Sequence, residues 1–253
     1  MASETFKDYF SDQAAAYMAY RPRYPSALFD YLATVAPANT RAWDCATGSG
    51  QAALGLAPLF KQVIATDASE AQIARATGAD NIVYDVAAAE KSGIETASVD
   101  LIVVAQALHW FDLDSFYVEA ARVLKPCGII AAFCYSLLSI NPALDRVIAV
   151  YYRDIVGPYW PPERILVDNG YRSIPFPFSE LLPPEFGMEI SWSLEHLVGY
   201  LGTWSAAQKF REAKQEDPVQ LILDELKRAW GTAAEQRLIQ WPIHMRIGRQ
   251  PRA

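Results

Sequence analysis

The chain has 253 residues, of which 52% are hydrophobic and 20% are charged, and it carries a formal net charge of -7. This length and composition are typical of one large α/β domain with a sizeable core. The acidic balance disfavours a nucleic-acid-binding surface, and the sequence has no run of about 18 apolar residues with which to cross a membrane. We therefore expect a cytoplasmic protein, a monomer or homodimer, with neither nucleic acid nor a membrane as a partner.

Apolar runs alternate with amphipathic stretches over the first half of the chain, and this pattern predicts repeated β-α units with parallel strands. Strands are expected near residues 41–46, 62–67, 81–86, 99–105 and 128–135. Helices are expected near residues 50–60, 70–77 and 114–124, and the pair Lys125-Pro126 should end the last of them before the fifth strand.

The pattern changes after Tyr135. A helix is expected over residues 143–156, followed by a proline- and aromatic-rich region over 157–186 in which regular structure is interrupted. A short strand near 188–191, helices between 194 and 239 and a final strand over 243–248 complete the predicted order. A strand that follows helices in this way fits a seven-stranded, Rossmann-like α/β sheet whose last strand is antiparallel. Helices should cover both faces, with a loop-rich insertion after the fifth strand.

Two consecutive strands of this pattern end in residues suited to a nucleoside. The first strand opens into Ala46-Thr47-Gly48-Ser49-Gly50, where glycines without a Cβ atom allow positive φ and the close approach of a ligand. The second strand ends at Asp67, about 20 residues further on, where a carboxylate can accept both hydroxyls of a ribose. The alanine at position 46 is expected to keep a negative φ in this turn.

The cysteines and histidines do not suggest a metal site. None of the three cysteines forms a C-x-x-C pair, and no two of the three histidines lie four residues apart on one helix face. We expect neither a metal ion nor a framework of disulfides.

The spacing of the glycine turn separates two kinds of cofactor. A dinucleotide fingerprint, G-x-G-x-x-G/A, read from Ala46 places Gln51 where a small residue should let the helix pack closely against the strand. The pattern D-x-G-x-G-x-G instead fits Asp44, Ala46, Gly48 and Gly50, with alanine for the first glycine. In this form the chain resembles the class I S-adenosylmethionine (SAM)-dependent methyltransferases, whose turn receives the methionine part of the cofactor.

Three further stretches carry the same resemblance and indicate the methyltransferase type 11 branch, which is similar to small-carboxylate (trans-aconitate-type) methyltransferases. They are Arg21-Pro22-Arg23-Tyr24-Pro25, Gln106-Ala107-Leu108-His109-Trp110-Phe111 and Arg122-Val123-Leu124-Lys125-Pro126-Cys127-Gly128. Together with residues 241–248 they span most of the chain. The resemblance implies a methyltransferase but does not name the acceptor, because members that share these motifs act on unrelated molecules.

The resemblance also implies where SAM would lie. Its ribose would lie on Asp67 and its adenine beside Ala68. Ala88 stands where the family often has an acid that contacts the adenine amino group, so adenine is expected to meet backbone groups near Ala88 and Ala89. The methionine end would face Gln106 and the residues of the turn, which are Asp44, Ala46, Gly48 and Gly50.

An N-terminal segment folds over the cofactor in similar enzymes, and here that segment would include Tyr17 and Arg21, with Arg21 able to pair with the cofactor's carboxylate. His109 and Trp110 follow the fourth strand directly, at the edge where open α/β sheets bind ligands. Trp110 could wall the substrate pocket, as could Tyr135 and Trp204.

His109 could orient or deprotonate the acceptor, or it could simply pack against Trp110 as an aromatic pair. A carboxylate or phenolate acceptor needs no base, because alignment with the electrophilic sulfonium supplies much of the acceleration. An alcohol, an amine or a carbon acid would need one.

We expect one methyltransferase domain with four parts: a cofactor cap (1–35), a nucleoside-binding core (36–135), a substrate-lid insertion (136–187) and C-terminal core strands and helices (188–253). The aromatic residues of the insertion suggest a lid over an apolar or planar substrate, or else a hydrophobic cluster beneath a long loop. The predicted activity is methyl transfer from SAM to a small molecule, on an oxygen of a carboxylate or hydroxyl. The alternatives are a SAM-binding protein without transfer activity and a nicotinamide-dependent oxidoreductase.

Overall fold

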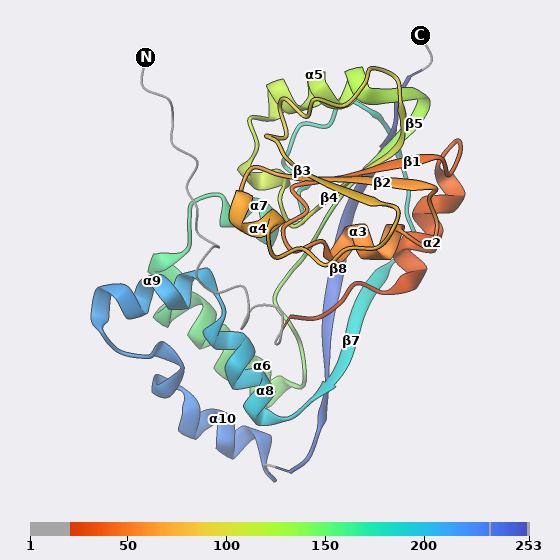
Figure 1. Cartoon of the computed structure of the whole chain (residues 1–253). Coiled ribbons are helices and arrows are strands. Elements are labelled where there is room, and N and C mark those ends of the chain that lie inside the picture. The colour runs from red at the N-terminus through yellow and green to blue at the C-terminus, as the bar shows by residue number, and fades with distance from the viewer. Residues whose placement is uncertain (1–20, 233, 252–253) are drawn as a thin grey trace.

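A computed structural model describes residues 21–232 and 234–251 (Figure 1). Five parallel strands form the first part of one sheet: β1 (Arg41–Cys45), β2 (Gln62–Asp67), β3 (Ile82–Val86), β4 (Val99–Ala105) and β5 (Leu124–Tyr135). Their order across the sheet is β3-β2-β1-β4-β5. The order reverses direction at β1, so the carboxyl ends of β1 and β4 lie side by side at the kind of position where open α/β sheets bind ligands.

Both faces of the parallel strands are covered. In β4, Leu101 and Val103 belong to one hydrophobic cluster, whereas Ile102 and Val104 belong to a second cluster on the opposite face. This alternation follows from strand geometry, in which successive side chains point to opposite faces. Helices α2 (Ser26–Val35) and α3 (Gln51–Leu56) contribute to the first cluster, and α5 (Leu113–Val123) contributes to the second.

A long strand, β8 (Arg237–Arg249), lies antiparallel beside β5. It also pairs with β6 (Ser179–Leu181) through residues 247–249 and with β7 (Phe186–Trp192) through residues 237–243. The described residues thus form an eight-stranded sheet in which β6 and β7 follow one another along β8. The predicted Rossmann-like sheet with an antiparallel last strand is confirmed, with β6 as an additional short strand.

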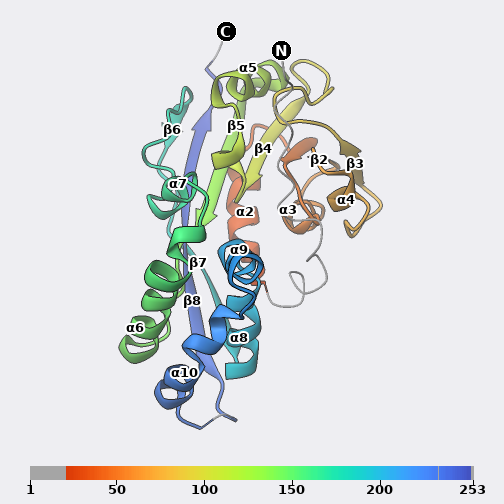
Figure 2. The same cartoon turned by 90° about the vertical axis from the view of Figure 1, so that its left-hand side faces the viewer.

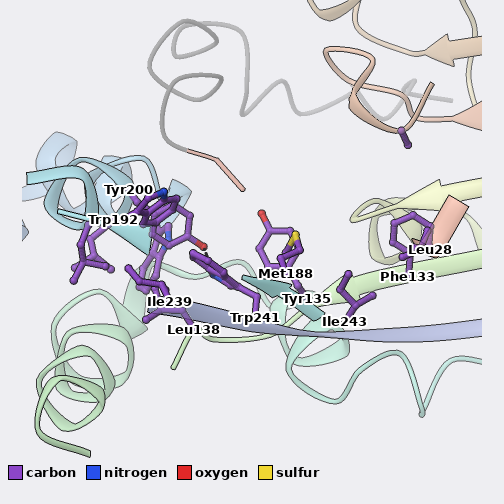
Figure 3. Packing of buried hydrophobic residues seen from close by; sticks show 14 of the residues in the cluster. Leu28, Phe133, Tyr135, Leu138, Met188, Trp192, Tyr200, Ile239, Trp241 and Ile243 are labelled. Atoms are coloured by element: carbon purple, nitrogen blue, oxygen red, sulfur yellow. Dashed lines mark hydrogen bonds between the residues drawn. The ribbon is translucent and has the colours of Figure 1, made fainter. Parts of the chain in front are cut away.

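The last strand is longer than predicted, because β8 begins at Arg237 rather than near residue 243. Its first half runs past the end of β5 and pairs there with β7. Four helices gather around this extension, as Figures 1 and 2 show: α6 (Pro142–Val150), α8 (Leu194–Gly202), α9 (Ser205–Lys214) and α10 (Leu223–Trp230). A cluster of buried side chains follows β8 from the sheet to these helices, with Trp192, Tyr200 and Trp241 at the helical end (Figure 3).

The insertion after β5 holds more regular structure than its prolines indicate. After α6 the chain continues as a π-helix (Tyr151–Ile155), a 3-10 turn (Gly157–Tyr159), α7 (Arg164–Asp168) and then β6. The start of α6 is well defined because Asn141 Oδ1 accepts the N–H groups of Ala143 and Leu144. The insertion therefore carries ordered walls that can surround a pocket.

Three shorter helices complete the described chain. α4 (Glu70–Ile73) is a single turn, shorter than the helix expected over residues 70–77. Two 3-10 turns span Leu108–Trp110 and Pro218–Leu221, and the first of these follows β4 directly. No helix in the described part of the chain is long and apolar enough to span a membrane.

Candidate active site

The turn after β1 has the left-handed backbone that a close approach of ligand requires. Gly48 and Gly50 have φ values of 57° and 88°, as predicted for glycines in this turn. Ala46 has a φ of 56°, so the expectation of a negative φ at this alanine is wrong. The backbone of the turn bends left-handedly at all three alternate positions, and Ala46 bears the steric cost of about 1–2 kcal/mol that a Cβ adds there.

The two glycines serve different purposes. A Cβ added at Gly48 would have nothing within 4 Å, so this glycine faces open space that a ligand can enter. A Cβ added at Gly50 would collide with the hydroxyl of Tyr84 on β3. A side chain at position 50 would therefore have to displace Tyr84, and the φ of 88° by itself favours glycine there.

Asp67 ties the turn to the end of β2. Its Oδ2 accepts the backbone N–H of Gly48 at 2.9 Å and its Oδ1 accepts that of Ser69 at 2.9 Å. These bonds fix the carboxylate beside the turn, where a ribose would meet it. Ala68 and Ala88, at the ends of β2 and β3, are exposed, whereas Ala89 is buried. The ribose and adenine roles of these residues stay predictions.

Asp44 provides a test of whether SAM fits the turn. Its carboxyl group is completely buried, and its Oδ2 accepts the hydroxyl of Thr47 at 2.5 Å. Its Oδ1 has no hydrogen-bond partner among the described residues. Burial raises the pKa of Asp44 from 3.8 to about 7, and the negative charge of the nearby Asp67 adds to the shift. An ammonium group such as that of SAM would supply the missing donor and charge, so the residues present fit this ligand.

A pocket lies at the carboxyl ends of β4 and β5, where Gln106 and Tyr135 line it. It brings together six residues that the sequence singled out, namely Arg21, Gln106, His109, Trp110, Tyr135 and Trp204. Its other walls come from the insertion and from α8 and α9, through Trp160, Arg164, Val167, Tyr200, Ser205 and Gln208. Tyr17 lies outside the described residues.

Arg21 links the N-terminal segment to this pocket. Its Nη1 donates to the hydroxyl of Tyr135 at 2.9 Å, and its guanidinium carbon lies 5.2 Å from the centre of the Tyr200 ring. The neighbouring Pro22 accepts a hydrogen bond from Gln51 at the start of α3. The segment is thus held between the glycine turn and the pocket, where Arg21 can meet either a cofactor or an acceptor.

His109 contacts two aromatic residues. Its Nδ1 lies 2.9 Å from the hydroxyl of Tyr171, and its ring centre lies 4.6 Å from that of Trp110. Burial, with the nearby charge of Arg164 as a second cause, lowers the pKa of His109 from 6.5 to about 3. The imidazole is therefore neutral at physiological pH and a weak base.

Arg164 is held in one orientation by its neighbours. Its Nε donates to the hydroxyl of Tyr152 at 2.7 Å and to Asp168 at 3.1 Å, and its guanidinium carbon lies 4.7 Å from the centre of the Trp160 ring. Neither Nη atom has a hydrogen-bond partner among the described residues. The end of the guanidinium is therefore available to a ligand in the pocket.

Sequence reasoning did not single out Arg164 or Tyr200, although both line the pocket. Arg164 stands four residues after Trp160, but Trp160 has an extended backbone and lies outside α7, so helical spacing does not predict their contact. Tyr200 carries no local signal either. The described residues contain no cluster of His, Cys, Asp and Glu that could hold a metal ion.

Comparison with known proteins places these features in a family. A model of the methyltransferase domain matches residues 43–132. A Dictyostelium discoideum protein that is named as a methyltransferase, without a named acceptor, is 33% identical over 252 residues, covering 97% of this chain and 96% of its own. A solved structure from Anaeromyxobacter dehalogenans, described as a type II methyltransferase, is 46% identical with a TM-score of 0.88 and covers 92% of this chain and 100% of its own.

A phosphoethanolamine N-methyltransferase from Haemonchus contortus, solved with phosphomonomethylethanolamine and S-adenosylhomocysteine (SAH), has a TM-score of 0.52. It is 17% identical and covers 99% of this chain and 61% of its own, so it supports the fold alone.

The similarity to these methyltransferases identifies the protein as a class I SAM-dependent methyltransferase, and the sheet order and the glycine turn beside Asp67 agree with that class. The chain belongs to the methyltransferase family that includes the Dictyostelium protein, to which it is similar over almost its whole length. These findings favour an enzyme of methyl transfer over a nicotinamide-dependent oxidoreductase.

Proposed function

We propose that the enzyme transfers the methyl group of SAM to an oxygen of a small carboxylic acid with an apolar or planar body. The observation that carries this proposal is the charge of the pocket beside Gln106 and His109. Its described lining includes the guanidinium groups of Arg21 and Arg164 and no Asp or Glu side chain. A carboxylate there would gain charge-assisted hydrogen bonds, whereas an amine in its cationic form would be repelled.

The orientation of Arg164 supports this class of acceptor. Its hydrogen bonds to Tyr152 and Asp168 use only Nε, its guanidinium carbon lies near the rings of Tyr152 and Trp160, and its two Nη atoms remain available. A guanidinium whose plane is fixed in this way matches the two oxygens of a carboxylate, and less of its entropy is lost when the ligand binds.

The apolar walls support a planar or hydrophobic body on the acid. Three tryptophans, Trp110, Trp160 and Trp204, line the pocket, and the rings of Trp160 and Trp204 lie 5.7 Å apart. Rings of this size bury a large apolar area and favour flat partners. Ser205 and Gln208 add a few polar groups that can fix the orientation of the ligand.

The protonation states in the pocket support an acceptor that is already an anion. When bound, SAM supplies an electrophilic methyl carbon, and its transfer to a carboxylate oxygen breaks the carbon–sulfur bond, leaves a neutral thioether and releases no proton. An alcohol must lose a proton during the same transfer, and His109 with its pKa of about 3 is a weak acceptor for that proton. The role of the chain's own residues is to bind the acid, align it and exclude water.

The proposal is tested by incubating the enzyme with methyl-labelled SAM and a panel of matched acceptors. Benzoate, phenylacetate and short di- and tricarboxylates would be compared with benzyl alcohol and benzylamine. We expect label to enter one or more acids as a methyl ester, which alkali releases as methanol. Transfer to the alcohol or the amine alone would contradict the proposal. A panel with no product but with SAH-dependent thermal stabilisation would favour a binding protein without transfer activity.

A further inference from the structure

Tyr171 is a buried phenol that faces a pocket residue. It follows α7, its side chain is completely buried, and its φ of 61° is unusual for a tyrosine. Its position is well anchored, because its backbone N–H donates to Leu166 and its carbonyl accepts a hydrogen bond from Arg246 on β8 at 3.0 Å. A bulky residue held in a strained conformation by several contacts is typical of functional sites.

The hydrogen bond between Tyr171 and His109 can be formed in two ways. Either the phenol O–H donates to Nδ1 of His109, or Nδ1–H donates to the phenol oxygen, and the two arrangements place the imidazole proton on opposite nitrogens. The first leaves the proton on Nε2, and the second leaves Nε2 as a lone pair able to accept a proton. The chemistry that His109 offers to the pocket depends on this choice.

The surroundings of the phenol decide between the two. Nδ1 of His109 is the only hydrogen-bond acceptor found for the Tyr171 hydroxyl among the described residues. If Nδ1–H donated instead, the buried phenol O–H would have no acceptor, which is costly inside a protein.

We propose that Tyr171 holds His109 as the Nε2–H tautomer, so that His109 donates a hydrogen bond to the acceptor's carboxylate and does not remove a proton from it. Tyr171 is thus a positioning residue that acts through His109. Together with the Nη atoms of Arg164, the Nε2–H group gives the pocket a set of donors that selects an anion. The identity of the carboxylate rests on the proposed function, whereas the tautomer rests on the contacts of Tyr171 alone.

The tautomer can be measured without any acceptor by two-bond proton–nitrogen correlation spectra of the full chain labelled with ¹⁵N-histidine and saturated with SAH. The chain has three histidines, and a His109→Gln variant assigns the signals of His109 by their loss. We expect a protonated Nε2 and an unprotonated Nδ1 at pH 7. A protonated Nδ1 would overturn the inference. Tyr171→Phe should give a mixture of both tautomers.

Tyr117→Phe is the matched control, because Tyr117 is also a buried phenol of the same hydrophobic cluster and donates to the backbone of Pro175. It should leave the spectrum of His109 unchanged. Benzoate added to the SAH complex should shift the Nε2–H signal, whereas benzyl alcohol at the same concentration should not. Equal shifts with both probes would contradict selection of an anion by this donor.

A double-mutant cycle tests whether Tyr171 acts through His109. With an acid that the panel shows to be methylated, Tyr171→Phe should raise KM about tenfold and leave the affinity for SAH unchanged. In the His109→Gln background the same change should have no further effect. An undiminished effect there would mean a purely structural role and overturn the inference. If no acid is methylated, the proposed function fails, and the spectra alone still decide the tautomer.

Discussion

The two ends of the active site are built in different ways. The cofactor end uses one glycine turn after β1 and a carboxylate at the end of the neighbouring β2. Their geometry is set by the parallel pairing of the two strands and by the hydrogen bond that the backbone N–H of Gly48 donates to the Asp67 carboxylate. The acceptor pocket draws its walls from positions between Arg21 and Gln208, which meet only through tertiary packing. Changes at the cofactor end should therefore act on cofactor affinity, and changes in the acceptor pocket on acceptor affinity.

The largest effect is expected for Asp67→Ala. At about 100 times its dissociation constant, SAH should stabilise the unchanged enzyme by about 2.7 kcal/mol. The variant should lose most of this stabilisation, because a ribose would lose hydrogen bonds to a charged group, and the dissociation constant should rise about 100-fold or more. Thermal shifts and calorimetric titration with SAH measure both. Asp30→Ala, at an exposed position of α2, is the control, and an equal loss in both variants would refute a ribose role for Asp67.

At the other end, Arg164→Met should raise KM for the acid acceptor by about 30- to 100-fold, because a bidentate charged contact is lost. Affinity for SAH should be unchanged. Arg164→Lys should give a KM between those of Arg164→Met and the unchanged enzyme, since lysine keeps the positive charge but lacks the paired N–H donors of the guanidinium. Initial-rate measurements with saturating SAM give KM and kcat separately. Arg172→Met, at an exposed position in the same insertion, is the control and should behave like the unchanged enzyme. A fall in SAH affinity with Arg164→Met would contradict the assignment of Arg164 to the acceptor pocket.

A smaller effect at the cofactor end should follow pH. Because burial raises the pKa of Asp44 to about 7, the carboxylate form that suits an ammonium ligand is lost as pH falls through 7. SAH affinity should be nearly constant above about pH 8 and fall by up to tenfold per pH unit below 7. Calorimetric titrations between about pH 5.5 and pH 8.5 test this, with Asp44→Asn expected to remove the slope.

The same shift has a consequence for the ligand-free fold. A carboxyl whose pKa is higher in the folded than in the unfolded state favours folding at low pH, so this contribution is lost as pH rises from about 4 through 7. Denaturant unfolding without ligand should show that decline, and Asp44→Asn should reduce it. If the free energy of unfolding instead rose between pH 4 and pH 7, and Asp44→Asn removed that rise, a raised pKa for Asp44 would be contradicted.

The smallest effect is expected at Ala46. Replacing it by glycine relieves a left-handed alanine, worth about 1–2 kcal/mol, and the greater freedom of glycine in the unfolded chain offsets much of this gain. The net stabilisation should be about 0.5 kcal/mol, with SAH affinity unchanged. Ala97→Gly is a matched control, since Ala97 has a φ of 51° and is exposed on a loop before β4. Denaturant unfolding compares them, and a large loss of SAH affinity in Ala46→Gly would show that the methyl group contacts the ligand.

The sequence predicted strands β1 to β4 well because each is a short run rich in apolar residues and bounded by turn residues. β5 begins at Leu124 rather than near residue 128, because Leu124 already pairs with Val99 of β4. It also located the glycine turn and Asp67, which follow from local spacing. The φ of Ala46 could not be read from its residue type, since the hydrogen bond from Thr47 to Thr66 and the packing of the turn override the preference of an alanine. β6 was missed because three residues in a proline-rich segment give no periodic signal.

Only part of the acceptor pocket could be predicted from the sequence. His109, Trp110 and Tyr135 were found because they follow strand ends. Arg164 was not, because its proline-rich surroundings predict a loop, whereas a short helix and the side chains of Tyr152 and Trp160 fix it in place. Which phenol would meet His109 could not be predicted either, since Tyr171 lies 62 residues further along the chain and meets it only through tertiary packing.

The length of β8 also has a consequence for the order in which the molecule assembles. β6 and β7 have no strand partner other than β8 among the described residues, and β8 pairs with β5 from far along the chain, as in the register of Ile129 with Arg249. Such distant pairings form slowly, because a long loop must close first. Arg246 on this strand anchors Tyr171, and Trp241 donates to the hydroxyl of Tyr200. The parallel strands can therefore pair early in folding, whereas the acceptor pocket becomes complete only when β8 has paired with β5.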